Sequence, residues 1–181
     1  MTIRSESQRA AAIDRLLDRA ELEELAALYA RAVDRGDREL LLSLYHADAV
    51  DHHGNDFHGS PPQFADYVQG ATAIFEVTAH YIVNSSYEIE GDKADGELYF
   101  VAYHRMRPPE PNEIVVAGRY LDRYERRGGA WKIAHRSIVW DWASTSQMTA
   151  QAMQLLRDRG DGGGQGDDAS RKALPLLARR R

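Results

Sequence analysis

The chain has 181 residues, enough for one domain with a buried core. Its net charge of -5 is spread along the sequence, so no basic patch for nucleic acid is visible, and the absence of cysteine excludes disulfides and thiolate metal sites. No apolar run approaches the ~20 residues of a membrane span, and the polar N-terminal stretch does not read as a signal peptide. We therefore expect a soluble, cytoplasmic protein.

The first predicted elements are two helices. Residues 1–10 form an expected flexible lead-in, and a helical pattern then runs from Ala11 to Asp34. Gly36 suits a left-handed helix end, and Asp37 suits the N-cap of a short helix Arg38–Tyr45. The buried stripe of the long helix follows three-four spacing: Leu22, Leu25, Leu28, Tyr29, Ala32 and Val33. Because Asp34 borders this stripe, its carboxyl group needs a partner.

A hairpin and a third helix follow. The segment HADAVDHHGNDFHG carries Gly54-Asn55, which predicts a small hairpin near the surface. Ser60-Pro61-Pro62 is typical of a helix start, and this helix should end near Ile74 or Phe75.

The pattern then changes to period two, which predicts strands joined by short turns. Their expected ranges are Val77–Glu90, Asp95–Arg107, Glu113–Arg126 and Ala130–Trp142. Consecutive strands with short connections form an antiparallel meander. Helices first and strands last predict an α+β fold with the helices packed on one face of a curved sheet.

The C-terminal part carries weaker signals. Ser144–Arg157 has a weak helical pattern, and residues 158–181 form a Gly-rich, basic segment that we expect to be a flexible tail. The predicted domain therefore spans residues 11–157.

Titratable and aromatic residues share strand faces. Thr78 and His80 lie on one face of their strand, and the next strand places Phe100, Ala102 and His104 together. Arg136 and Trp140 share a face of the last strand. If these faces line the concave side of the sheet, they form a pocket with aromatic walls. Period two alone leaves open which face is inside.

His80 is the best partner for Asp34 that the sequence offers, but ordinary structural roles remain open. Asp34 could cap its helix or pair with a nearby arginine, and His80 could be a core histidine. Arg136 could be an ion-pair partner for Asp34, and Tyr29 could be core because it lies on the apolar stripe.

The hairpin segment is rich in potential metal ligands. They are His46, His52, His53 and His58 with Asp48, Asp51 and Asp56. No helical pair of histidines or similar ligand spacing is present, and the loop is expected to be exposed, so we predict no metal site there.

Three segments carry a resemblance to a known family. Residues 21–50, TAHYIVNSSYEIEGDKADGELYF and AGRYLDRYERRGGAWKIAHR resemble the SnoaL-like branch of the NTF2-like superfamily. The resemblance covers roughly Ala11 to Trp142. It implies a cone-shaped curved antiparallel sheet, an α+β barrel with N-terminal helices over its concave face.

Within that superfamily the chain resembles a lyase group: hexachlorocyclohexane dehydrochlorinase, scytalone dehydratase and bile-acid 7α-dehydratase. The resemblance implies an Asp–His dyad formed by Asp34 and His80, and a catalytic arginine at Arg136, five residues after Trp131. Tyr29 matches a site tyrosine of the bile-acid enzyme, and His104 resembles a second histidine of scytalone dehydratase.

These matches imply a lyase of dehydratase or dehydrohalogenase type that needs no metal or organic cofactor. Its substrate would be a small hydrophobic or cyclic molecule bound by His104, Phe100, Ala102, Thr78 and Trp140. An isomerase, a polyketide cyclase and a non-catalytic assembly subunit, such as the dioxygenase β subunit, share the fold and remain alternatives. The resemblance also implies a homo-oligomer, in particular a homotrimer.

Overall fold

A computed structural model describes residues 5–107, 112–159 and 168–177. The helices are α1 (Glu6–Arg35), α2 (Arg38–Ser43), α3 (Pro61–Thr72), α4 (Ala150–Arg159) and α5 (Ala169–Ala173). The strands are β1 (Tyr45–His53), β2 (Phe57–Gly59), β3 (Phe75–Glu90), β4 (Lys93–Met106), β5 (Asn112–Arg127) and β6 (Ala130–Gln147). Among these described residues, no helix combines the length and apolar character needed to cross a bilayer.

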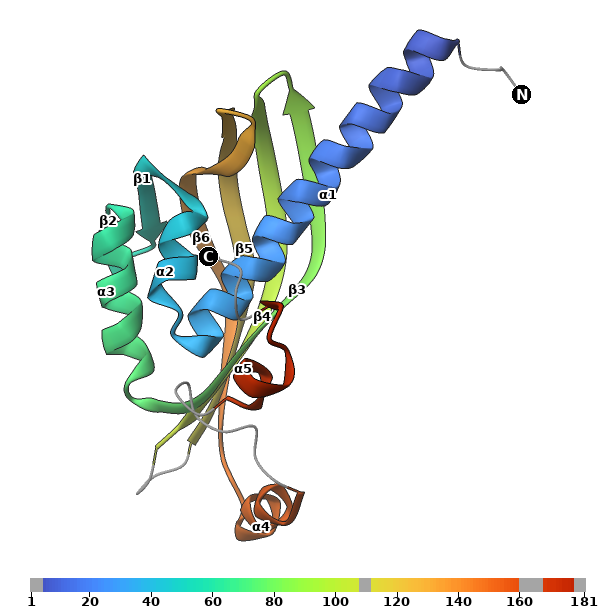
Figure 1. The fold of residues 1–181 in the computed structure, drawn as a ribbon. Helices are drawn as coiled ribbons and strands as arrows, with labels where there is room; N and C mark the ends of the chain where they lie inside the picture. The colour runs from blue at the N-terminus through green and yellow to red at the C-terminus, as the bar shows by residue number, and fades with distance from the viewer. Residues whose placement is uncertain (1–4, 108–111, 160–167, 178–181) are drawn as a thin grey trace.

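The strands form one curved sheet with the order β2-β1-β6-β5-β4-β3 (Figure 1). The predicted meander is confirmed, since β3 to β6 pair antiparallel in chain order. The expectation of a wholly antiparallel sheet is wrong, because β1 lies parallel to β6. Strand β1 follows the helical layer and enters the sheet beside the last strand, where no short hairpin dictates its direction.

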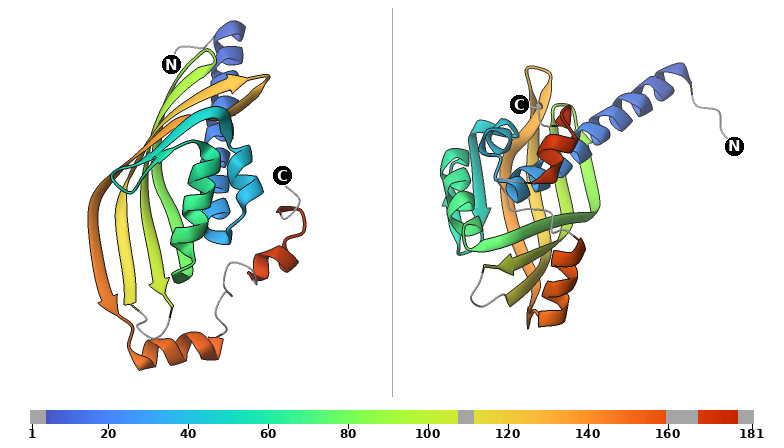
Figure 2. Two further views of the ribbon diagram at one scale, coloured as in Figure 1. Left: turned by 90° about the vertical axis from the view of Figure 1, so that its left-hand side faces the viewer. Right: turned by 60° about the horizontal axis from the view of Figure 1, so that its bottom comes forward.

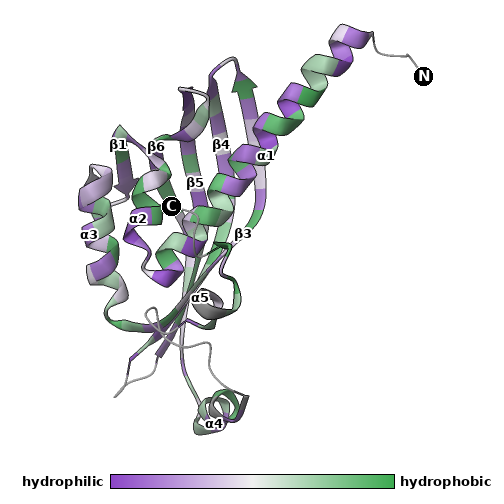
Figure 3. Cartoon of the chain, in the orientation of Figure 1, coloured by the Kyte–Doolittle hydropathy of each residue, from purple (hydrophilic) through white to green (hydrophobic). Residues whose placement is uncertain are grey.

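Helices α1, α2 and α3 cover one face of the curved sheet, as the side view shows (Figure 2). The core between these layers is apolar and is centred on the second half of α1, helix α3 and the inner faces of β4 to β6. The first half of α1 extends past the sheet (Figure 3). Its Ile13, Leu16 and Leu17 are exposed. Burial of the second half therefore fixes α1 to the sheet.

Helix boundaries follow the capping residues. Gly36 adopts the left-handed conformation expected of it, with φ 58°, and Asp37 caps α2 through a bond from the Leu40 amide. Helix α1 begins five residues earlier than expected, because Ser5 and Gln8 form a capping box. Part of the predicted lead-in is therefore helical, and residues 1–4 lie outside the described residues.

The C-terminal elements also differ from expectation. Strand β6 continues to Gln147 because it pairs with β5 as far as Asn112, so α4 starts only at Ala150. Short helix α5 lies within the predicted tail, where Asp168 forms an ion pair with Arg35 at 2.9 Å. Of that tail, residues 160–167 and 178–181 lie outside the described residues.

Candidate active site

A cavity of about 160 Å³ lies between the concave face of the sheet and helices α1 and α3. Its walls are mostly aromatic and aliphatic, with titratable side chains at two separate places. The main apolar wall residues are Phe64, Tyr67, Phe75, Phe100, Ile138 and Trp140. Such a mainly apolar pocket with a few polar groups is typical of small-molecule sites.

Asp34 and His80 form a bonded pair at the wall of this cavity. His80 Nδ1 lies 2.7 Å from Asp34 Oδ1, and the His80 backbone N–H donates to Asp34 Oδ2 at 2.8 Å. Asp34 belongs to the last turn of α1, and His80 belongs to β3, which is an edge strand. The carboxylate therefore bonds an amide that the sheet leaves free and orients the ring of the same residue.

The charge on Asp34 is stabilised by this arrangement. Burial alone would raise the pKa of Asp34, but the hydrogen bonds and charge of His80 outweigh it, so the pKa is lowered from 3.8. A carboxylate only accepts hydrogen bonds, so we assign a proton to Nδ1 of His80. In the neutral ring, Nε2 then keeps a free lone pair.

His104 lies beside this pair. Its ring centroid is 5.5 Å from that of His80, with the two planes nearly perpendicular, and it also contacts Phe75. Burial and the neighbouring His80 lower the pKa of His104 to about 4. His104 is therefore neutral at pH 7 and can accept or donate a hydrogen bond without carrying charge.

Most of the other predicted wall residues reach the cavity. Phe100, Ala102 and Trp140 of the sheet and Tyr29 of α1 all line it. Burial raises the pKa of Tyr29 well above 10, so its hydroxyl stays protonated. Thr78 differs from the prediction: it is buried next to the Asp34–His80 pair and does not line the cavity.

Arg136 also differs from the prediction, because the structure does not place it on the cavity wall. It is fully buried and donates to both carboxylate oxygens of Asp122, at 2.7 and 2.6 Å. Its guanidinium lies 3.9 Å from the ring centre of Tyr29 and 4.3 Å from that of Tyr120. Its partner is thus Asp122 rather than Asp34, and the role of stabilising a leaving group is not supported.

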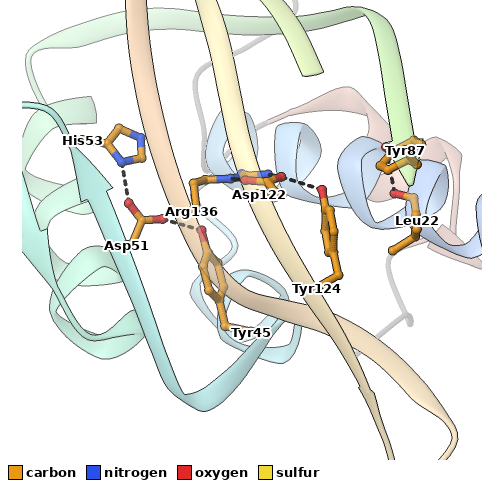
Figure 4. A network of polar contacts seen from close by, with 8 residues as sticks. All are labelled: Leu22, Tyr45, Asp51, His53, Tyr87, Asp122, Tyr124 and Arg136. Atoms are coloured by element: carbon orange, nitrogen blue, oxygen red, sulfur yellow. Dashed lines mark hydrogen bonds and ion pairs between the residues drawn. The ribbon is translucent and has the colours of Figure 1, made fainter. Parts of the chain in front are cut away.

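Sequence reasoning missed a second histidine–carboxylate pair. His53 Nδ1 lies 2.5 Å from Asp51 Oδ1, and the Tyr45 hydroxyl donates to Asp51 Oδ2 at 2.6 Å (Figure 4). The hairpin was expected near the surface, yet Asp51 is fully buried and His53 lines the cavity. The two-residue spacing places both on the inner face of β1, and that spacing is the signal that could have found them.

Other parts of the described chain offer weaker sites. A hollow of about 610 Å³ includes Leu121, His135 and Ser137, but its histidine bonds only the Ser137 hydroxyl, at 3.0 Å. The described His, Asp and Glu residues form no group of three or more that could hold a metal ion.

A curved sheet with N-terminal helices over its concave face is the architecture of the NTF2-like proteins. The family model of the SnoaL-like domain matches residues 14–137. The chain belongs to the SnoaL-like domain family.

Solved structures share the fold. LinA is 25% identical with a TM-score of 0.68, covering 77% of this chain and 95% of its own. The hexachlorocyclohexane dehydrochlorinase LinA-type3 of Novosphingobium barchaimii LL02 is 24% identical, with a TM-score of 0.68 and coverages of 75% and 94%. A candidate scytalone dehydratase of Novosphingobium aromaticivorans DSM 12444 is 20% identical, with a TM-score of 0.67 and coverages of 75% and 92%. No curated protein matches the chain.

Proposed function

We propose that the protein is a cofactor-free lyase that removes a proton and a leaving group from a small hydrophobic or cyclic substrate. The observation that carries this proposal is the orientation of His80. Its Nδ1 is held by Asp34 at 2.7 Å, while the ring lines a mainly apolar cavity. Nε2 is therefore the atom available to a ligand.

In the proposed reaction, neutral His80 accepts a proton from carbon at Nε2. Asp34 holds the ring in the correct tautomer and stabilises the imidazolium that forms. An imidazole is a weak base, so the carbon must be activated, for example by a neighbouring carbonyl group. Acid–base assistance of this kind is worth about 10²–10⁴-fold in rate.

The remaining wall residues suit binding. Phe100, Ala102 and Trp140 offer apolar contact, which favours a hydrophobic ring. His104, neutral because its pKa is about 4, can position a hydroxyl group or a water molecule next to His80. The protonated hydroxyl of Tyr29 is a candidate donor to a substrate carbonyl.

The family adds support, because a solved structure with this fold is named as a hexachlorocyclohexane dehydrochlorinase. The predicted homotrimer and the cytoplasmic location stay predictions from the sequence. Light scattering of the purified chain would measure the oligomeric state.

The test is a substrate panel of β-hydroxy ketones, hydroxysteroid thioesters and halogenated rings, followed by absorbance and mass spectrometry of the alkene product. We expect His80→Gln to abolish turnover and His135→Gln, in the separate hollow, to preserve it. Turnover that survives in folded His80→Gln would refute the assignment. A product of unchanged mass would instead indicate an isomerase, and no turnover by the folded wild-type protein would favour an assembly role.

A further inference from the structure

The pair His53–Asp51 repeats the geometry of His80–Asp34 at another place on the same cavity. In both pairs Nδ1 of the ring bonds a carboxylate, at 2.5 Å for His53 and 2.7 Å for His80. Both rings line the cavity. The same reasoning that leaves Nε2 of His80 for a ligand leaves Nε2 of His53.

The two pairs reach the cavity from strands at opposite ends of the sheet, on the same concave face. His80 is on the edge strand β3, whereas His53 is on β1, and strands β6, β5 and β4 separate them. Because the sheet is curved, the strands near its two edges face a common concave space (Figure 2). The His53 ring is held there by stacking on Phe64 of α3, with ring centroids 4.6 Å apart. A ligand in the cavity thus lies between two carboxylate-bound imidazoles.

Burial distinguishes the two carboxylates, since the side chain of Asp51 is 0% exposed and that of Asp34 is 10% exposed. The register places Asp51 and Asp122 on either side of Arg136 across β1, β6 and β5 (Figure 4). Arg136 donates hydrogen bonds to Asp122 from its Nε and one terminal nitrogen. This buried row holds two carboxylates and one guanidinium, so one negative charge remains at Asp51. Because Asp51 is the more deeply buried of the two carboxylates and an unpaired buried charge is costly, we assign the acid proton to His53.

We propose that His53 is a second catalytic residue, a general acid that protonates the leaving group, and that the substrate class is therefore a β-hydroxy carbonyl compound. This inference rests on the proposed lyase function. A hydroxyl group leaves readily only as water, and so needs an acid. A halide leaves as the free anion and does not need one.

The reaction balances without a further reagent. The C–H bond next to the carbonyl breaks and its proton moves to Nε2 of His80, while the electron pair forms the C=C bond. The C–O bond at the β carbon breaks, and the oxygen takes the Nε2 proton of His53 to leave as water. His80 then carries the proton from the substrate carbon, the proton of His53 has left with the water molecule, and proton exchange with solvent restores both rings.

Asp51 is a positioning residue in this scheme. Its carboxylate is fully buried, and it receives a bond from Tyr45 as well as from His53. It therefore fixes the ring orientation and favours the cationic form of His53, without touching the substrate itself.

The first test compares His53→Gln with His52→Gln. His52 is the neighbouring residue on β1; its ring lies 5.2 Å from that of His58 in a tilted arrangement, and it does not line the cavity. The probes are a β-hydroxy ketone and its β-chloro counterpart, beginning with 3-hydroxycyclohexanone and 3-chlorocyclohexanone, with spontaneous elimination subtracted. For His53→Gln we expect kcat/KM to fall about 10²–10⁴-fold on the hydroxy ketone. On the chloro ketone it should stay within about threefold of wild type.

The outcomes separate the inference from the proposed function. If His53→Gln retains the hydroxy ketone activity while His80→Gln loses both activities, the lyase stands and the role of His53 falls. The inference also falls if wild type eliminates chloride but never water from any substrate of the panel. If the wild-type protein turns over neither the hydroxy nor the chloro substrates, the lyase proposal is refuted, and this inference is refuted as well.

A second measurement does not depend on folding of His53→Gln. Nitrogen-15 NMR of histidine-labelled wild-type protein reports the charge of each ring directly, with His53 assigned by elimination from His→Gln variants at the other six histidines. We expect His53 to have both nitrogens protonated at pH 7, and His104 to be neutral. A neutral His53 at that pH would overturn the role of acid. In turnover, the wild-type pH profile on the hydroxy ketone should be bell-shaped, and His53→Gln should lose its alkaline limb.

Discussion

The buried pair of Arg136 and Asp122 allows a quantitative test of how the core is held together. Replacing Arg136 with Met keeps the volume but leaves the Asp122 carboxylate buried without its two charged hydrogen bonds. Removing one partner of such a pair typically costs about 3–5 kcal/mol. For a chain of this size each kcal/mol corresponds to about 2–4 °C in Tm, so we expect a fall of about 6–20 °C.

The double variant Arg136→Met with Asp122→Leu is the matched control. It removes both charges, so no carboxylate is left unpaired at position 122, and replacement of a whole buried pair is often neutral or better. We therefore expect it to regain most of the lost stability. Urea unfolding followed by circular dichroism measures all three proteins, with equal m-values required for the comparison.

The opposite pattern would refute this reasoning. A loss below about 1 kcal/mol in Arg136→Met, together with abolished turnover in the folded variant, would mean that Arg136 acts on the substrate. It would restore the role that the family resemblance implied and contradict the burial of its side chain.

Three further predictions concern glycine packing and pH. Gly118→Ala should lower the free energy of unfolding by about 1–3 kcal/mol, because an added Cβ would lie 2.0 Å from the Val139 carbonyl oxygen. In Gly70→Ala of α3 the added Cβ meets open space, so this variant should raise the free energy of unfolding by about 0.5–1 kcal/mol. Thermal unfolding measures both. The pKa of His104 is lowered from 6.5 to about 4, so the folded state binds fewer protons and its contribution to stability, present above pH 6.5, is lost as pH falls toward 4. Urea titrations should therefore show a weaker dependence on pH between 6.5 and 4 in His104→Phe, and an unchanged slope would contradict the burial argument. The pKa of Asp34 lies below 3.8, so its contribution is present above that pH and is lost as pH falls further; the stability difference between wild type and Asp34→Asn should shrink below pH 4 in the same titrations.

Local patterns predicted the elements that depend on local physics. The three-four spacing of α1, the left-handed Gly36 and the alternation around Phe100 and Ala102 each describe contacts that neighbouring residues determine. The positions of Asp34 and His80 came from a family resemblance, and the structure places the two side chains in direct contact.

Contacts between distant strands could not be predicted in this way. Nothing in residues 45–59 specifies that β1 pairs with β6, yet this pairing places Asp51 beside Arg136. The same pairing turns a hairpin that looked exposed into a wall of the cavity. Arg136 was assigned to the cavity because it shares a strand face with Trp140. The alternation of the strand does not show how deeply a side chain is buried, nor that Asp122 of β5 lies beside Arg136.

The bond from the His80 amide to Asp34 has a consequence for the solubility of the folded state. Edge strands expose unpaired N–H groups that can recruit strands of other chains, and β3 is such an edge. By occupying one of these donors, the end of α1 blocks strand addition at the middle of that edge. Asp34 therefore protects the edge of the sheet in addition to the catalytic role proposed for it, so its loss would carry two separate penalties.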